Sequence, residues 1–522
     1  MKSNLPLSFD GQDQDYGRCR VVIENVTPEV GKGNFPIKRE AGDLVVVEAD
    51  IFADGHDSVA SALLYKKEGA PSWEESPMEP LENDRWQASF RVQELGRYRY
   101  TLMGWVDPFA SWYKGFLKKY EAGQDVSTEM LVGARMVMDV LQKASGADAK
   151  SLEATAYTLT SDAFPYEAKI GTALSEELTK LMNVYQERRF ATVYPKELSV
   201  VVDRKEARFS AWYEMFPRSA TPRQGPHGTF KDVEGLLPYV QEMGFDVLYF
   251  PPIHPIGKTK RKGKNGAVVC LPDDPGSPWA IGSKDGGHKA VHPELGTLED
   301  FRALVLRAKD FGIEVALDIA YQCSPDHPYI REHPEWFRIR PDGGIQYAEN
   351  PPKRYEDIVP FDFDSNRWAA LWEELASIVL FWIGQGVRIF RVDNPHTKPF
   401  RFWQWLIPRI KAAHPGVLFL SEAHTRPKVM YELARVGFCQ SYTYFPWKTA
   451  KWELEQYFSE LTKTQAVEFF RPSLWINTPD ILTEYLQSGG RPAFVIRLIL
   501  ASTLGSNYGV YGPPFELMER LP

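Results

Sequence analysis

The chain has 522 residues, of which 43% are hydrophobic and 25% charged, and this composition excludes collagen, a coiled coil and wholesale disorder. Its length allows three or four domains, or one large barrel with smaller companions. The net charge of −8, from 69 acidic and 61 basic side chains, provides no broad positive field, so we expect no nucleic-acid partner.

The N-terminus carries no apolar leader, and the longest apolar runs, such as 378–383, are far too short to span a membrane. We therefore expect no membrane partner. The cysteines lie far apart and form no CxxC pair, which favours a reducing compartment and a cytoplasmic location. They are Cys19, Cys270, Cys323 and Cys439.

Residues 1–106 have the alternation of antiparallel strands. Apolar and polar side chains alternate over 86–92 and 97–102, and 44–51 is a further strand candidate. We predict a small, immunoglobulin-like β-sandwich here. Residues 107–194 are instead rich in Ala, Glu, Lys, Leu and Met, with apolar residues at helical spacing, which predicts a helical insert.

From residue 195 to 522, short apolar runs alternate with longer amphipathic stretches. The candidate strands are 209–216, 247–250, 315–319, 387–392, 417–420, 441–444, 474–476 and 508–511. The candidate helices between them include 232–243, 298–311, 367–385 and 400–414. Eight strand-then-helix steps predict an α/β fold, a (β/α)8 TIM barrel, with a long loop after its third strand at about 320–365.

Four of these strands end in an acid: Asp318, Asp393, Glu422 and Asp480. A single strand-end acid is often a helix cap, but four on one barrel face are harder to explain structurally. Crowded carboxylates repel one another and raise each other's pKa, at a cost of about 1.4 kcal/mol per pKa unit. The C-terminal ends of barrel strands are also where active sites form. We therefore predict an acidic active site.

Glycosyl transfer is the chemistry that this cluster fits best. One carboxylate attacks the anomeric carbon, another group protonates the departing oxygen, and further acids hold sugar hydroxyls. Metal catalysis is the competing interpretation, but the nearby histidines form no HxH or HExxH motif, so we expect no metal and no cofactor. These histidines are His254, His288, His327, His396 and His424.

The segments GVRIFRVDN, FLSEAH and NTPD, preceded by the strand that ends in Asp318, resemble the four short regions of the α-amylase superfamily of retaining α-glycosidases and transglycosylases. The resemblance implies a barrel with Asp393 as nucleophile, Glu422 as general acid/base and Asp480 as transition-state stabiliser. It also implies that Arg391 keeps the nucleophile ionised by charge pairing.

Two departures from the superfamily pattern narrow the resemblance. Gln322-Cys323 replaces the usual Asn-His, and Pro479 replaces the usual His before the last Asp. With AWYEMFPRS, PPIHPIGKTKRKGKN, QCSPDHP, RYEDIVPFDF and RVDNPHTKPF, the chain resembles the maltosyltransferases that use α-maltose 1-phosphate. This branch implies an α-1,4-glucan acceptor, release of phosphate and a homodimer.

A donor site for the phosphorylated sugar follows from the same resemblance. It implies contacts from Lys262, Gln322, Asp357 and Asn394, with Asn350 and Tyr355 as neighbours. Lys262 belongs to the basic run 258–264, which would offset the phosphate charge beside the carboxylates. Aromatic residues near the site are candidates for stacking on the acceptor, although each alone also fits ordinary packing. They are Trp279, Tyr321, Trp336 and Tyr347.

Two other functions stay open at this point. One is an amylase-like hydrolase or disproportionating enzyme that works without phosphate, and the other is a non-catalytic glucan-binding scaffold. The sandwich and insert use about 200 residues, and the eighth strand is reached only near Tyr508. We therefore expect a barrel that is incomplete at the C-terminus, with a Lys-Tyr pair of the donor site lying beyond Pro522.

Overall fold

The computed structural model describes residues 16–221 and 227–521, which divide into two compact units. The first unit comprises Met1–Asn34, Gly42–Val92 and Arg97–Val200, and the second Phe35–Ala41, Gln93–Gly96 and Val201–Pro522. The N-terminal segment, which we predict to lack a leader, lies outside the described residues.

The first unit contains two β-sheets. One has the order β1 (Val21–Thr27), β3 (Leu44–Ala53), β7 (Arg85–Arg91), β6 (Glu79–Pro80). The other has the order β10 (Leu198–Asp203), β8 (Gly96–Val106), β4 (Val59–Lys67), β5 (Glu74–Pro77), with β9 (Thr192–Val193) on β8. Strand β2 (Ile37–Glu40) belongs to the second unit. Along β3, Val45, Val47 and Ala49 are buried, as period-two alternation requires.

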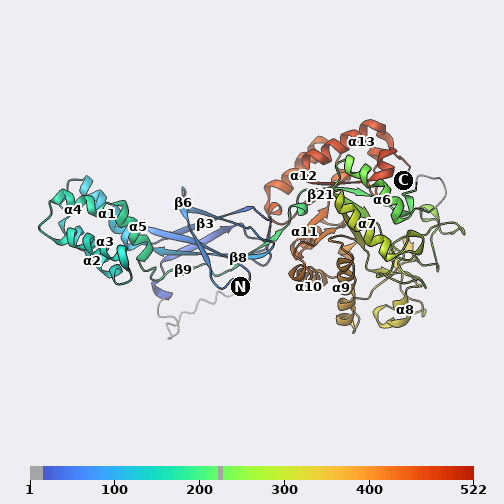
Figure 1. Ribbon diagram of the computed structural model, residues 1–522, viewed down its shortest axis with the longest axis horizontal. Coiled ribbons are helices and arrows are strands. Elements are labelled where there is room, and N and C mark those ends of the chain that lie inside the picture. The colour runs from blue at the N-terminus through green and yellow to red at the C-terminus, as the bar shows by residue number, and fades with distance from the viewer. Residues whose placement is uncertain (1–15, 222–226, 522) are drawn as a thin grey trace. The chain divides into compact units, whose positions relative to one another are not determined.

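Five helices follow β8 and lie together in Figure 1. They are α1 (Pro108–Glu121), α2 (Ser127–Leu141), α3 (Gly146–Thr160), α4 (Tyr166–Ala173) and α5 (Glu176–Tyr185). The carboxylate of Asp107 begins α1 by accepting a hydrogen bond from the backbone N–H of Ala110 at 2.8 Å. Their shared apolar core includes Trp112, Val137 and Leu152.

The second unit is built on a closed barrel of eight parallel strands. Their order is β11 (Ser210–Glu214), β12 (Val247–Phe250), β13 (Glu314–Ile319), β18 (Ile389–Val392), β19 (Leu418–Ser421), β20 (Gln440–Tyr442), β21 (Pro472–Trp475), β22 (Asn507–Tyr511). Strand β22 pairs in parallel with β11 and closes the barrel. The predicted α/β fold with a (β/α)8 barrel is confirmed.

Helices surround these strands (Figure 1). They include α6 (Phe230–Glu242), α7 (Leu298–Asp310), α9 (Trp368–Gly384), α10 (Phe400–Ala413), α11 (Pro427–Val436), α12 (Lys451–Lys463) and α13 (Glu484–Leu504). Thr229 and Thr297 begin α6 and α7 with reciprocal capping boxes. A separate apolar cluster, with Trp212, Tyr249 and Trp475, fills the barrel interior, so the barrel is packed and not a channel.

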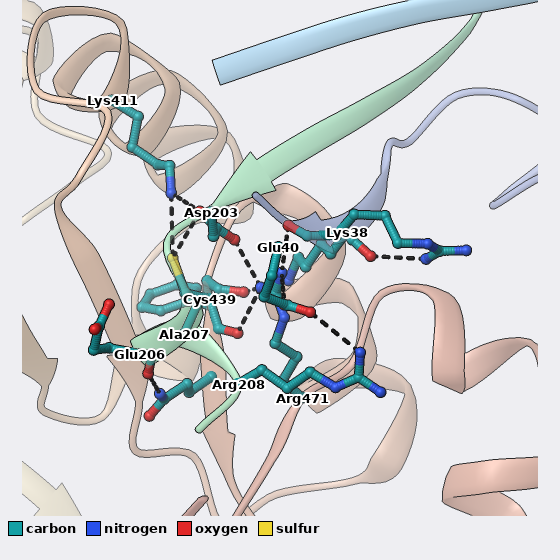
Figure 2. A network of polar contacts seen from close by, with 12 residues as sticks. Lys38, Glu40, Asp203, Glu206, Ala207, Arg208, Lys411, Cys439 and Arg471 are labelled. Atoms are coloured by element: carbon teal, nitrogen blue, oxygen red, sulfur yellow. Dashed lines mark hydrogen bonds and ion pairs between the residues drawn. The ribbon is translucent and has the colours of Figure 1, made fainter. Parts of the chain in front are cut away.

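A buried charge network lies where the chain enters the N-terminal ends of β20 and β21 (Figure 2). Asp203 pairs with Lys411 and, at 2.7 Å, with Arg471. Arg471 also pairs with Glu40 of β2 at 2.7 Å, and Lys38 donates to the backbone carbonyl of Phe438. Burial lowers the pKa of the Lys38 amine to about 7. The network joins β2 to strands that follow hundreds of residues later.

Asp203 is expected to contribute strongly to stability. Burial alone would raise its pKa, but the charges of Lys411 and Arg471 lower it to about 2. Its ionisation therefore contributes about 2 kcal/mol above pH 4, which is lost as the pH falls toward 2. Asp203→Asn leaves the buried Lys411 without a carboxylate partner and removes one of the two carboxylates that pair with Arg471, and it should cost about 3–5 kcal/mol of unfolding free energy at pH 7.

Urea unfolding of both proteins between pH 2 and pH 7 measures this effect. The decrease in unfolding free energy between pH 7 and pH 2 should be smaller by about 2 kcal/mol in the variant. Asp310→Asn is the control, because the Asp310 side chain is 64% exposed, and it should change stability by less than about 0.5 kcal/mol. Equal unfolding free energies for Asp203→Asn and the parent would contradict the assignment.

No helix in 16–221 or 227–521 is both long and apolar enough to cross a membrane. The four cysteines are free, and Cys323 and Cys439 are buried. Cys439 lies in the network of Figure 2, where Lys411 donates to its sulfur at 3.5 Å.

Candidate active site

Arg391 joins three of the four predicted acids. Its Nη1 donates to Asp318 Oδ2 and to Asp393 Oδ1, each at 2.8 Å. Its Nη2 lies 3.5 Å from Glu422 Oε2. All four side chains are at least 87% buried, so these charge-assisted contacts are poorly screened by solvent.

The barrel places these residues together because β13, β18 and β19 are adjacent strands. Asp318 lies near the end of β13, whereas Asp393 and Glu422 directly follow β18 and β19. Asp318 is registered opposite Arg391. The carboxyl ends of parallel strands meet at one edge, so Asp318, Asp393 and Glu422 lie together.

Aromatic side chains contact Asp318 and lie beside Arg391. Tyr249 Oη donates to Asp318 Oδ2 at 2.6 Å, and Trp279 Nε1 donates to the same oxygen at 3.3 Å. The guanidinium carbon of Arg391 lies 5.9 Å from the ring centroid of Tyr249 and 5.8 Å from that of Tyr442. These contacts fix the cation from two sides.

Asn394 connects the acids that follow β18 and β19. Its φ of 43° and ψ of 51° lie in the left-handed region, which asparagine tolerates better than most residues. In this conformation its backbone N–H donates to Glu422 Oε2 at 3.1 Å, and its side-chain amide donates to Asp393 Oδ2 at 3.4 Å. One strained residue therefore orients both carboxylates.

Glu422 has the electrostatics of an acid/base group. Burial raises the pKa of its carboxyl to about 7, with Arg391 opposing the rise and Asp393 adding to it. A group with a pKa near the working pH can both accept and donate a proton. Burial likewise raises the pKa of Asp318, against the opposing charge of Arg391.

Asp480 lies in the tight turn after β21, where its backbone N–H donates to Thr478 Oγ1 at 3.2 Å. The residue keeps a solvent-exposed surface. Partial burial of its carboxyl raises the pKa of Asp480, Arg391 opposes the rise, and Asp393 adds to it. Asp480 is thus coupled to the other acids through charge.

The predicted donor-site residues fall into separate groups. Gln322 Nε2 donates to the carbonyl of Trp279 at 3.3 Å, and the indole of the same Trp279 contacts Asp318. Burial raises the pKa of Asp357, and the charge of Lys262 lowers it. Within the described chain, no hydrogen bond links this Lys262–Asp357 group to the acids around Arg391.

The long loop after β13 contains a short hairpin. This hairpin consists of β15 (Ala348–Asn350) and β16 (Lys353–Tyr355), paired so that Asn350 faces Lys353. The charge of Lys353 opposes the rise in the pKa of Asp480. The neighbours expected of the donor site, Asn350 and Tyr355, therefore share a hairpin with a cation whose charge acts on a predicted catalytic acid.

Comparison with known proteins gives the family. A family model described as alpha-1,4-glucan:maltose-1-phosphate maltosyltransferase, domain N/S, matches residues 19–204. The chain is 55% identical over 506 residues to the alpha-1,4-glucan:maltose-1-phosphate maltosyltransferase of Chlorobaculum tepidum, covering 97% of this chain and 75% of that protein. It is 51% identical over 523 residues to the enzyme of the same name from Methylacidiphilum infernorum, covering 100% and 76%.

This chain belongs to the alpha-1,4-glucan:maltose-1-phosphate maltosyltransferase family. Among solved structures, an alpha-amylase from Lactobacillus plantarum matches with a TM-score of 0.44 and 24% identity, covering 59% of this chain and 71% of that one.

Three polar residues of this family member were not found by sequence reasoning. Glu214 ends β11 and is 2% exposed. Lys398 is buried, and its amine donates to the carbonyls of Asp393 and Asn394 at 3.4 and 3.3 Å. Lys353 is the hairpin cation. Lys398 could have been considered from the sequence, because it lies five residues after the predicted nucleophile. The places of Glu214 and Lys353 near the site follow only from the folded barrel.

Two of the histidines near the site, His288 and His327, are occupied by hydrogen bonds. The backbone N–H of Tyr329 donates to His327 Nδ1 at 3.0 Å, which leaves the proton on His327 Nε2 for His288 Nδ1 at 3.0 Å. His288 Nε2 then donates to the carbonyl of Ala320 at 3.0 Å. Burial lowers the pKa of both rings to about 3. Although Cys323 lies close to them, this chain uses the nitrogen lone pairs that a metal would need.

Two of the four aromatic residues considered for the acceptor are buried instead. Tyr321 is 1% exposed and Trp336 is 3% exposed, stacked on His333 with ring centroids 3.8 Å apart. Both therefore pack the loop after β13, which was the alternative interpretation. Trp279 and Tyr347 are only half-buried, so part of each aromatic ring remains accessible to a ligand.

Proposed function

We infer that this chain is a retaining maltosyltransferase. It transfers a maltosyl unit from α-maltose 1-phosphate to the non-reducing end of an α-1,4-glucan and releases phosphate. Family membership supports the reaction. The observation that carries the mechanism is the single guanidinium of Arg391, which contacts both Asp393 and Glu422. Two carboxylates held this close suit a double displacement.

In the first step we assign Asp393 as the nucleophile. A carboxylate oxygen of Asp393 forms a bond to C1 of the maltosyl unit while the bond from C1 to the phosphate oxygen breaks. The product is a covalent β-maltosyl ester and free phosphate. Phosphate has a second pKa near 6 and leaves with little help from an acid. Asp480, coupled by charge to Asp393, is assigned to stabilise the positive charge that develops on the sugar ring.

In the second step we assign Glu422 as the general base. The 4-hydroxyl of the glucan passes its proton to Glu422 and attacks C1, and the ester bond to Asp393 breaks. Two inversions at C1 give net retention of the α-anomer. A sugar hydroxyl is a poor nucleophile without a base, and the pKa near 7 of Glu422 suits that task.

We assign donor binding to Lys262, Gln322, Asp357 and Asn394. Lys262 supplies positive charge for a phosphate monoester of about −1.5 to −2 charges. Gln322 and Asp357 suit sugar hydroxyls as donors and acceptors. Asn394 already contacts both central acids, so its side-chain amide is placed to donate to the phosphate oxygen when the donor binds.

Release of inorganic phosphate tests the function directly. The protein mixed with α-maltose 1-phosphate and glycogen should release phosphate and lengthen the glucan, and omission of glycogen should slow the release strongly. Glucose 1-phosphate is the matched control donor, because it lacks the second sugar. Glucan cleavage or disproportionation without any phosphate release would favour the amylase-like alternative, and glucan binding with neither reaction would favour the scaffold.

A homodimer and a cytoplasmic location are further parts of this proposal. Neither Cys323 nor Cys439 is exposed, and all four cysteines are free, as suits a reducing compartment. Light scattering should give twice the chain mass of 59.6 kDa, and a monomer at micromolar concentration would contradict the dimer.

A further inference from the structure

Glu214 is a carboxylic acid at the centre of the barrel that the proposed reaction does not use. Side chains alternate along a strand, so Glu214 points to the same side as Trp212, whose ring belongs to the interior cluster. It is registered opposite Tyr249 of β12 and Tyr511 of β22. Glu214 is therefore an interior residue at the C-terminal end of its strand, where the predicted catalytic acids also lie.

Among the residues that the structure describes, none forms an ion pair with the Glu214 carboxyl. The Oε2 atom of Glu214 is buried and has no hydrogen-bond partner among these residues. An ionised carboxylate that is buried without a partner is strongly destabilised, and such a group takes up a proton instead.

The surroundings of Glu214 oppose its ionisation. Arg391, the cation whose charge acts on Glu214, is already shared by three carboxylates. The acids that face Glu214 are Asp318, Glu422 and Asp480. The phenols that face it are Tyr249, Tyr442 and Tyr511. Burial raises the pKa of Glu214 well above its ordinary value, Arg391 opposes the rise, and the acids add to it.

We propose that Glu214 is a positioning residue that is held as a neutral carboxylic acid, so that the charge of Arg391 serves only the three carboxylates that Arg391 contacts. An ionised Glu214 would draw Arg391 away from Asp393 and Glu422. It would also add a negative charge where the phosphate of the donor must approach. This role rests on the proposed function, whereas the protonation state of Glu214 does not.

Infrared spectroscopy tests the protonation state without any turnover. At pH 9, Glu422 is ionised because its pKa is near 7, but a neutral Glu214 still gives a carboxylic C=O band. The band should shift when the protein is labelled with ¹³C-glutamate, and it should be missing in Glu214→Gln. Absence of a glutamate-derived band in the parent protein overturns the proposal, whether or not the variant folds.

The pH profile of the transfer step tests the positioning role. Glu214→Gln replaces one neutral group by another. The apparent pKa of Glu422 in the pH profile of the transfer rate should therefore stay within about 0.2 pH units of its value in the parent protein. If Glu214 were ionised, removal of its charge would lower that apparent pKa by about one unit, and this result overturns the proposal. Glu299→Gln is the control, with a side chain 76% exposed. A parent protein that releases no phosphate contradicts the proposed function but leaves the infrared result standing.

Discussion

Asp393→Ala is expected to form no glycosyl-enzyme and to lose at least about 10⁴-fold in kcat, because the variant has no nucleophile for C1. Glu422→Ala should behave differently. Phosphate can leave without its help, so the variant should form the β-maltosyl ester, while transfer to the glucan slows by about 10²–10⁴-fold because no base activates the acceptor.

Intact-protein mass spectrometry after mixing with α-maltose 1-phosphate distinguishes the two variants. Glu422→Ala should gain the mass of one maltosyl unit, and Asp393→Ala should gain none. Glu455→Ala is the matched control, because the Glu455 side chain on α12 is 66% exposed, and it should turn over as the parent does. An unlabelled Glu422→Ala protein, or a labelled Asp393→Ala protein, would reverse the assigned roles.

Arg391→Met is expected to lower the free energy of unfolding by about 3–5 kcal/mol, because it removes the cation from a buried cluster and leaves the carboxylates without a partner. It should also change the pH profile. Arg391 lowers the pKa of Glu422, so its removal raises that pKa. Glu422 then stays protonated to higher pH, and transfer becomes slow at neutral pH and recovers only under alkaline conditions.

Urea unfolding and the pH dependence of transfer measure the two effects separately. Arg391→Lys keeps the charge but loses the planar fork that serves several carboxylates at once, so it should recover part of the stability and most of the pH profile. Arg401→Met on α10 is the control, since Arg401 is exposed and contacts only Gln404 among the described residues. If the apparent pKa in the pH profile of transfer were the same in Arg391→Met as in the parent protein, the assigned role of the Arg391 cation would be contradicted.

The barrel could be predicted because its strands are short, apolar and regularly spaced. The predicted strand 247–250 coincides with β12, and the predicted strand 508–511 differs from β22 by one residue. The acids could be predicted because a parallel barrel gathers the ends of its strands at one face. A local pattern, an apolar run that stops at a carboxylate, was enough to select Asp318, Asp393 and Glu422 as candidates.

The rest depends on contacts that no local pattern records. The acid of Glu214 lies inside a strand motif and not after one, so its burial follows only from barrel closure between β11 and β22. Tyr321 and Trp336 are of the residue types that often bind ligands, but Tyr321 packs against Phe402 and Trp403 of α10. Trp336 stacks on His333. The left-handed turn at Asn394 is likewise visible only as a backbone conformation.

The buried network beneath the barrel has a consequence for biosynthesis. Lys38 and the Phe438 carbonyl that it contacts are 400 residues apart, and a ribosome adds roughly 5–20 residues per second. The segment that carries Lys38 and Glu40 must therefore wait roughly 20–80 s for its partners to be translated. During that time its charged and apolar groups are exposed to chaperones and proteases, so slow or stalled translation before β20 should be the stage at which this protein is most easily lost.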